Sequence, residues 1–226
     1  PRMDTIDTMK KPRKICMNSV AQKIYDFMDT VEKLCYIKRY TIMKNGERET
    51  DSDHIMKLMF MISMVTPYIK QPVDSQKMLE MALVHDIVEA DAGDVPSFEQ
   101  TPEVKAQKKA REQQVIEKYK NELPDLIGNK FYDLFMEFEK QETIESKIVK
   151  AFDRFESNIQ CLKENYGARY WAYAGHSIMK ALRTKELNAG IDEEIIDLLS
   201  DIQLENAIEN INTCKEQGLI DQNMDI

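Results

Sequence analysis

The sequence predicts an all-α protein, and three features support this fold class. Glycine and proline occur only seven times each among 226 residues, so residues that favour turns are scarce. Hydrophobic residues make up 42% and charged residues 31%, which is typical of a globular chain with a buried core. Apolar residues also recur at helical spacing through most of the chain. We expect a loosely ordered lead-in over residues 1–18 and a single helical domain over residues 19–226.

The first helix is predicted to begin after Ser19, which is a good N-cap residue. Residues 36–53 then break the helical pattern, contain the turn signal Asn45-Gly46 and end in an acidic run, so we expect a loop there. The core-facing stripe predicted for the first helix is Val20, Ile24, Phe27, Met28, Val31 and Leu34.

Two helices with methionine-rich apolar faces should follow and pair as an antiparallel hairpin. They are expected over about 52–68 and, after the N-cap Asp74, over about 74–90. Gly93 can adopt positive φ and Pro96 hinders continuation, so the second of these helices should end before them.

The second half of the chain is expected to be helical almost throughout. Thr101-Pro102 is a strong helix start, and a highly charged helix follows it. Shorter helical patterns cover residues 131–141 and 143–162, and additional C-terminal helices are expected over about 166–217. The core-facing positions predicted here are Phe131, Leu134, Phe135, Phe138, Ile144, Ile148, Phe152, Phe155, Ile159, Leu162, Ile195, Leu199, Ile202 and Ile208.

Charge and composition exclude several classes of function. The net charge of −9 argues against binding long nucleic acid, which requires a basic surface. No apolar run approaches the roughly 18 residues that span a bilayer, and the first residues have no apolar signal core, so we expect a soluble, cytoplasmic protein without a membrane partner. The four cysteines are scattered without a C-x-x-C pair, which indicates neither a zinc knuckle nor a disulfide framework.

The segment 81–96 combines an apolar helix pattern with a histidine and several carboxylates. A buried ionised carboxylate costs several kcal/mol unless a metal, a proton or a partner charge offsets it. His85 and Asp86 are about 100° apart on a helix, so they can share an ion only near a helix end or over a cleft. Glu89 lies four residues after His85 and projects over the same face one turn later.

A lone His-Asp dipeptide is usually not a site, but the scarcity of histidine strengthens this one. The chain has only three histidines, and His54 also stands at a helix entrance. Asp153 lies close to the apolar stripe of its own helix, where its charge must be balanced by Lys150, Arg154 or a cation. Alone it would be read as a salt-bridge residue, and beside the two histidines it becomes a candidate ligand.

The order His54, His85-Asp86, Asp153 resembles the H…HD…D metal signature of the HD phosphohydrolase superfamily, and more closely its 5′-deoxynucleotidase branch. The segments 39–54, 82–95 and 145–153 resemble three motifs of that branch, including an arginine 15 residues before the first histidine (54 − 39). The resemblance covers roughly residues 20–165, and the C-terminal quarter carries no matching motif.

The resemblance implies an HD-domain helical bundle that binds one divalent ion, which could be Mn, Co, Zn, Fe or Mg. Its implied ligands are His54, His85, Asp86 and Asp153, while Glu89 acts on the water, Asp94 assists near the leaving group or substrate, and Arg39 holds phosphate. The chemistry is consistent with these roles, since imidazole and carboxylate ligands suit such metals, a carboxylate can accept a proton, and a guanidinium clamps phosphate.

Two residues depart from the pattern of the branch. Tyr40 stands where the bacterial enzymes have tryptophan, which puts the seating of the sugar in doubt. Asp91 adds a further negative charge beside the site.

The expected function is a metal-dependent phosphohydrolase that releases phosphate from (deoxy)nucleoside 5′-monophosphates. A nucleoside triphosphate phosphohydrolase of the same superfamily and a non-catalytic, metal-stabilised nucleotide-binding module remain as alternatives, although the latter would need neither Glu89 nor Arg39. A two-metal phosphodiesterase is disfavoured because only His176 remains to bind a second ion, and an alarmone hydrolase because Ala90 stands where those enzymes favour an acid. Base and sugar preference and oligomeric state, including a homodimer, are left open.

Overall fold

The computed structural model describes residues 19–43, 45–94, 101–161, 180 and 191–218. These parts of the chain are mostly helical, which confirms the all-α fold class. The expected lead-in over residues 1–18, most of the C-terminal helical pattern expected between residues 166 and 190, and His176 lie outside the described residues. None of the described helices combines the length and apolar character needed to cross a membrane.

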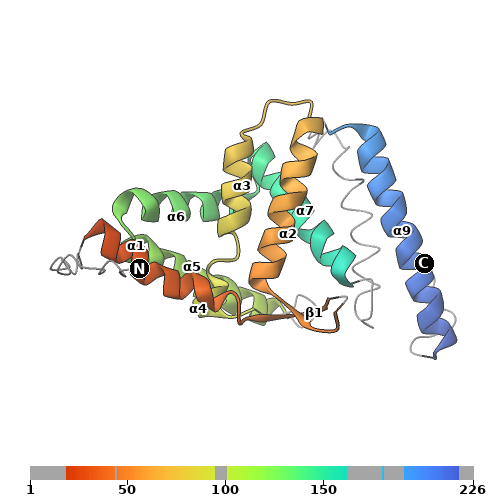
Figure 1. Ribbon diagram of the computed structural model, residues 1–226, viewed down its shortest axis with the longest axis horizontal. Helices are drawn as coiled ribbons and strands as arrows, with labels where there is room; N and C mark the ends of the chain where they lie inside the picture. Colours follow the sequence, from red (N-terminus) through yellow and green to blue (C-terminus); the bar gives the residue numbers. More distant parts are fainter. Residues whose placement is uncertain (1–18, 44, 95–100, 162–179, 181–190, 219–226) are drawn as a thin grey trace, which may run out of the picture.

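Three helices form the centre of the fold: α2 (Asp51–Val65), α3 (Ser75–Val84) and α7 (Ile144–Cys161). Figure 1 shows α2 and α3 side by side with α7 crossing behind them. The predicted helical hairpin is therefore confirmed as α2 and α3, which are joined through the short 3-10 helix η1 (Thr66–Tyr68). The fully buried side chains at this centre are Leu58, Ile62, Met78, Met81, Ile148 and Phe152.

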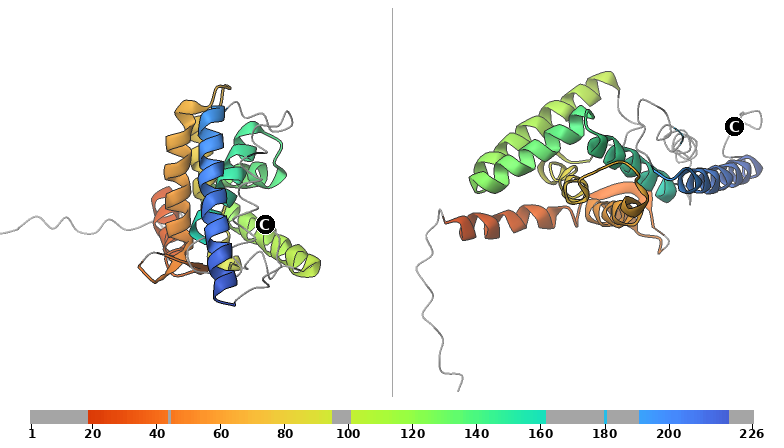
Figure 2. Two further views of the ribbon diagram at one scale, coloured as in Figure 1. Left: turned by 90° about the vertical axis from the view of Figure 1, so that its right-hand side faces the viewer. Right: turned by 90° about the horizontal axis from the view of Figure 1, so that it is seen from above.

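A second helix pair, α5 (Pro102–Glu122) and α6 (Asp125–Lys140), packs against this centre (Figure 2). Thr101 caps α5 through its side chain, as predicted. The two helices approach so closely that a Cβ at Gly128 would lie 2.3 Å from the carbonyl oxygen of Lys120, so only glycine fits there. Because α6 begins at Asp125, it is longer than the helical pattern over 131–141 predicted.

Helix α1 (Val20–Lys33) begins after Ser19, whose side chain accepts a hydrogen bond from the backbone N–H of Gln22 as an N-cap should. Only part of its predicted stripe is buried. Phe27 packs edge-on against Tyr119 at a centroid distance of 5.2 Å, and Leu34 is also buried. Because α1 lies at the edge of the fold (Figure 2), much of the stripe stays exposed, at Val20, Ile24 and Met28.

The expected loop over residues 36–53 is instead a short antiparallel hairpin of β1 (Lys38–Ile42) and β2 (Arg48–Thr50). The predicted turn is present, with Gly46 at φ 83°. The strands were missed because segments of five and three residues are too short to establish a two-residue periodicity. The hairpin leads directly into α2.

The helix predicted over 74–90 is interrupted. Asp74 caps α3 as expected, but α3 ends at Val84, a turn follows, and the short helix α4 (Glu89–Ala92) continues the chain. Gly93 ends α4 at φ 76°, as its position predicted. His85 and Asp86 therefore stand at a helix end, the arrangement in which adjacent residues can face one ion.

The last described helix, α9 (Glu193–Glu216), lies at the edge of the fold farthest from α1 (Figure 1). The N–H of Asp192 donates to the carbonyl oxygen of Tyr68 over 3.0 Å, which ties the start of α9 to the end of η1. The predicted core face is shifted by about one residue, because Ile202 is exposed. The buried positions on α9 are Ile196, Ser200, Gln203, Ala207 and Ile211.

Candidate metal centre

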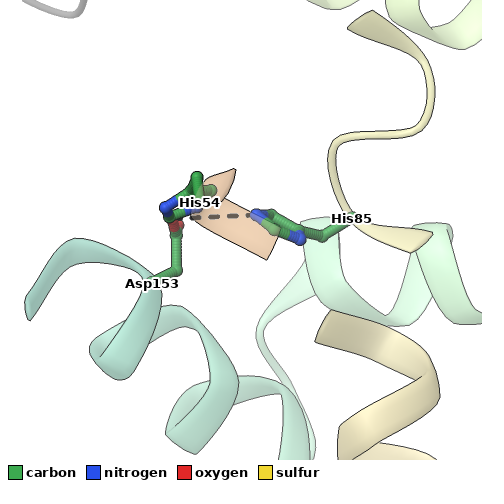
Figure 3. A group of neighbouring side chains, drawn as sticks. All are labelled: His54, His85 and Asp153. Atoms are coloured by element: carbon green, nitrogen blue, oxygen red, sulfur yellow. Dashed lines mark hydrogen bonds and ion pairs between the residues drawn. The ribbon is translucent and has the colours of Figure 1, made fainter. Parts of the chain in front are cut away.

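Four side chains from three parts of the fold meet in the interior. His54 lies in the first turn of α2, Asp153 lies on α7, and His85 with Asp86 forms the turn after α3. Both histidines and Asp153 are buried. Figure 3 shows the two imidazole rings and the Asp153 carboxyl group directed toward one another.

One nitrogen of each histidine and one carboxylate oxygen of Asp153 lie within 4.8 Å of one another, and Asp86 adjoins this group. Nε2 of His54 lies 3.1 Å from Oδ1 of Asp153 and 3.8 Å from Oδ2 of Asp86. Nε2 of His85 lies 3.1 Å from Oδ2 of Asp86 and 3.7 Å from Oδ1 of Asp153. Nitrogen and oxygen ligands bind zinc at roughly 2.0–2.2 Å, which places neighbouring ligand atoms about 3.0–3.5 Å apart. The observed spacing is close to that of a metal site.

Hydrogen bonds on the outer side fix how each histidine faces the rest of this group. Nδ1 of His54 pairs with Oε2 of the buried Glu156 at 2.5 Å, and Nδ1 of His85 pairs with the carbonyl oxygen of Ala82 at 2.8 Å. A proton on each Nδ1 leaves a lone pair on Nε2, as in metal-binding histidines. Nε2 of His85 has no hydrogen-bond partner among the described residues. Two imidazole lone pairs and two carboxylate oxygens thus converge.

A cation accompanies each of the two carboxylates, at the far oxygen of Asp153 and at the histidine-facing oxygen of Asp86. Nζ of Lys150 lies 3.0 Å from Oδ2 of Asp153. The other carboxylate oxygen of Asp153, Oδ1, faces the histidines. Nη1 of Arg39 lies 3.3 Å from Oδ2 of Asp86. Nitrogen and oxygen acceptors that face one another with no proton between them repel, and a divalent cation would relieve this repulsion. The group of His54, His85 and Asp153 could therefore hold a metal.

The same carboxylates favour protonation of the neighbouring histidines. Burial opposes a charge on His85, but Asp86 and Asp153 outweigh it and raise the pKa of His85 to about 10. These residues therefore need either protons or a metal to neutralise the pocket. The imidazole and carboxylate donors fit a divalent transition metal.

Glu89 and Asp94 belong to a second cluster of acidic side chains. Glu89 is buried, with Oε1 2.8 Å from Nζ of Lys108 and Oε2 without a hydrogen-bond partner among the described residues. Burial and the nearby Asp86 raise the pKa of Glu89, while Lys108 lowers it. Carboxylate oxygens of Asp51, Glu89 and Asp94 lie within 4.8 Å of one another, so this oxygen-only group could also hold a cation.

Asp51 is a member of this group that the sequence did not identify. It is fully buried, and neither of its oxygens has a hydrogen-bond partner in the described parts of the chain. Burial and Asp86 raise the pKa of Asp51 to about 7, although Arg39 lowers it. Its place in an acidic run before His54 resembled a solvated helix start, so local sequence gave no sign of burial.

Arg39 was expected in a loop, and it lies instead on β1. Its side chain is only 16% exposed and contacts three acidic residues: Nε lies 3.4 Å from Oε2 of Glu49, and Nη1 lies 3.6 Å from Oδ1 of Asp51 and 3.3 Å from Oδ2 of Asp86. Nη2 also donates to Oγ of Ser157 over 3.3 Å. Arg39 is thus built into the fold as well as facing the site.

Asp91 does not add charge to the site. Its oxygens pair with Nζ of Lys33 at 2.5 Å and Nζ of Lys118 at 2.8 Å, which joins α4 to α1 and α5. Partial burial raises the pKa of Asp91, but the two lysines outweigh this effect and lower it to about 2. The departure noted in the sequence is a structural ion pair.

Comparison with known proteins identifies the family. Residues 31–194, about three quarters of the chain, match the family described as HD domain. The chain belongs to the HD-domain family. A Xenopus laevis HD-domain relative named 5′-deoxynucleotidase HDDC2 is 31% identical over 148 residues, which cover 65% of this chain and 71% of that protein. The Dictyostelium discoideum protein of the same name is 31% identical over 143 residues, or 60% of this chain and 74% of that one.

Solved structures share the HD-domain fold. A predicted metal-dependent phosphohydrolase from Magnetospirillum magnetotacticum has a TM-score of 0.68 at 22% identity, covering 85% of this chain and 94% of its own. The HD phosphohydrolase of cyanophage S-2L, bound to dA and one catalytic Zn²⁺ ion, has a TM-score of 0.52 at 19% identity, covering 80% of this chain and 96% of its own. These likenesses support the helical HD-domain bundle predicted from the sequence.

Proposed function

We propose that this HD-domain protein is a metal-dependent phosphohydrolase that releases phosphate from (deoxy)nucleoside 5′-monophosphates. Its relatives in Xenopus laevis and Dictyostelium discoideum carry the name 5′-deoxynucleotidase. A yeast relative, 29% identical over 147 residues, carries the same activity name. Small nucleotides are therefore the proposed substrates.

The observation that carries the proposal is the position of Arg39 beside the converging ligands. Its guanidinium lies 3.3 Å from Asp86, so a phosphoryl group held by Arg39 would lie next to the centre formed by the histidines and Asp153. A guanidinium is suited to this because its planar donors match phosphate oxygens. A bound divalent cation would supply Lewis-acid stabilisation of the charge on those oxygens.

We assign the proton transfer to Glu89. Its Oε2 is buried and without a hydrogen-bond partner in the described ranges, so it can accept a proton from the attacking water, while Lys108 holds Oε1 in place. Burial raises the pKa of Glu89, which brings its basicity closer to neutral pH, where a general base is most effective. Asp94, close to Glu89, would assist on the leaving-group side.

Four ligands are proposed for the ion: His54, His85, Asp86 and Asp153. Their nitrogen and oxygen donors suit Mn²⁺, Co²⁺, Zn²⁺, Fe²⁺ or Mg²⁺ to differing degrees. The related cyanophage structure contains Zn²⁺, which supports a transition metal in a fold of this kind.

The deciding experiment measures phosphate and polyphosphate release from a panel of nucleoside mono-, di- and triphosphates with each of these metals. We expect inorganic phosphate from deoxynucleoside 5′-monophosphates in a metal-dependent reaction. Release of tripolyphosphate from triphosphates would favour the triphosphohydrolase alternative. Nucleotide binding without release of either product would identify a binding module.

A further inference from the structure

Two buried carboxylates lie behind the proposed site and take no part in the proposed reaction. Glu156 on α7 is 2% exposed, and Glu49 on β2 is fully buried. Buried carboxylates are costly unless a cation accompanies them. One side chain, Lys57 on α2, contacts both.

Lys57 bridges the two glutamates. Its Nζ lies 2.9 Å from Oε1 of Glu156 and also pairs with Oε1 of Glu49. The Lys57 side chain is 27% exposed, so these ion pairs are partly shielded from water. Lys57 follows His54 by three residues and so lies one turn along the same helix.

Each glutamate uses its second oxygen to hold a residue of the proposed site. Oε2 of Glu156 accepts the Nδ1 proton of His54 at 2.5 Å. Oε2 of Glu49 lies 3.4 Å from Nε of Arg39 and accepts a hydrogen bond from Thr41. The ammonium group of Lys57 therefore stands between the partner of a proposed metal ligand and the partner of the proposed phosphate clamp.

These contacts close a ring. From His54 it runs through Glu156, Lys57, Glu49 and Arg39 to Asp86, whose Oδ2 faces Nε2 of His54 at 3.8 Å. Without the ammonium group, two carboxylates would face each other in the interior. Rotating either one away would release His54 or Arg39 from its present orientation.

We propose that Lys57 is a positioning residue that orients both His54 and Arg39. Metal affinity and phosphate affinity then both depend on the Lys57 side chain, although it contacts neither the metal nor the phosphate. This inference rests on the proposed function, because it assumes that His54 binds a metal and Arg39 binds phosphate. In this arrangement Lys57 makes no direct contact with the substrate.

The test compares wild type with Lys57→Met and Lys57→Arg. Isothermal titration calorimetry with Mn²⁺, and in parallel with Zn²⁺, gives the metal affinity. Titration with inorganic phosphate at a saturating metal concentration gives the phosphate affinity. We expect Lys57→Met to weaken metal binding by about 10–100-fold, as loss of an outer-shell partner does. Phosphate binding should weaken by about tenfold, and Lys57→Arg should restore most of both.

Lys77 provides a matched control. Its side chain is 28% exposed and also bridges two glutamates, with Nζ 2.9 Å from Glu137 and 3.2 Å from Glu145. Neither of these glutamates contacts a proposed ligand. Lys77→Met should lower the melting temperature by less than Lys57→Met, because Glu137 and Glu145 are partly exposed, and it should leave both affinities within about twofold of wild type.

The possible outcomes are distinct. Wild-type affinities in Lys57→Met, together with a lowered melting temperature, would show that Lys57 is merely structural. An equal loss of affinity in Lys77→Met would show that general destabilisation is responsible, which also overturns the inference. Failure of the wild type to bind either metal would reject the proposed metal centre, and this inference with it. Lys57→Gln replaces Lys57→Met if the latter does not fold.

Discussion

Nη1 of Arg39 lies 3.3 Å from Oδ2 of Asp86, the same oxygen that faces Nε2 of His85 at 3.1 Å. One carboxylate oxygen is thus shared between the arginine and the proposed metal centre. The shared oxygen places a fixed positive charge directly beside the ligand set. It also means that a change at Arg39 acts on the fold and on the site together.

Arg39→Lys should impair both catalysis and stability. A lysine cannot reproduce the planar donor geometry of a guanidinium, so kcat/KM should fall by about one to two decades, as for loss of a charge-assisted hydrogen bond. The ion pairs with the buried Glu49 and Asp51 would also weaken, so the melting temperature should fall. Steady-state kinetics and thermal unfolding measure the two effects.

Arg48→Lys is the control for Arg39→Lys. Arg48 lies on the partner strand, is exposed, and its Nε donates to the carbonyl oxygen of Arg39 over 2.8 Å. Substitutions at exposed positions usually change stability by at most about 0.5 kcal/mol. Replacing Arg48 should therefore leave the site intact and change kcat/KM by less than about threefold. Normal kinetics in Arg39→Lys would show that Arg39 serves only the fold.

Asp153→Ala should lose the metal. The protein should contain about one transition ion per chain at the histidine-containing centre, and removing a carboxylate ligand should reduce that content to near zero. Elemental analysis after dialysis measures it. Asp133→Ala, an exposed position on α6, should retain the wild-type content. Full metal content in Asp153→Ala would exclude Asp153 as an essential ligand.

Glu89→Gln should reduce kcat by roughly 10²–10⁴ while metal at the histidine-containing centre is retained, because a general acid–base group contributes about that factor. Single-turnover measurements at saturating substrate report the chemical step. Glu112→Gln is the matched control, since Glu112 pairs with the same Lys108 at 3.3 Å from the other side. It should keep turnover within a few-fold of wild type. Equal turnover in Glu89→Gln and wild type would remove Glu89 from the mechanism.

Asp91→Asn should destabilise the protein in a pH-dependent way. Lys118 and Lys33 hold the pKa of Asp91 at about 2, below the ordinary aspartate value of 3.8, despite partial burial. A carboxyl group with a lowered folded-state pKa stabilises the fold above about pH 4 and loses that contribution as the pH falls toward 2. Urea unfolding of both proteins from pH 7 to pH 2.5 should show their difference shrinking. A difference that is constant with pH would mean that the ion pairs are not its source.

The sequence alone determined several helix starts and named the residues that meet at the candidate metal centre. Ser19, Asp74 and Thr101 cap helices where predicted, because an N-cap is a bond between residues two or three positions apart. His85 and Asp86 were expected near a helix end if they were to face one ion, and α3 does end there. The all-α class followed from composition and periodicity.

The tertiary structure decided what surrounds the candidate ligands. Glu156 and His54 are separated by 102 positions, so no local pattern pairs them, and the local sequence does not mark Lys57 as the bridge between Glu156 and Glu49. Which side of α1 and α9 is buried likewise depended on neighbouring helices, as exposed Ile24 and Ile202 show. Local hydrogen bonding sets where a helix begins, whereas burial and ion pairing depend on which distant segments pack together, and only the folded chain specifies that.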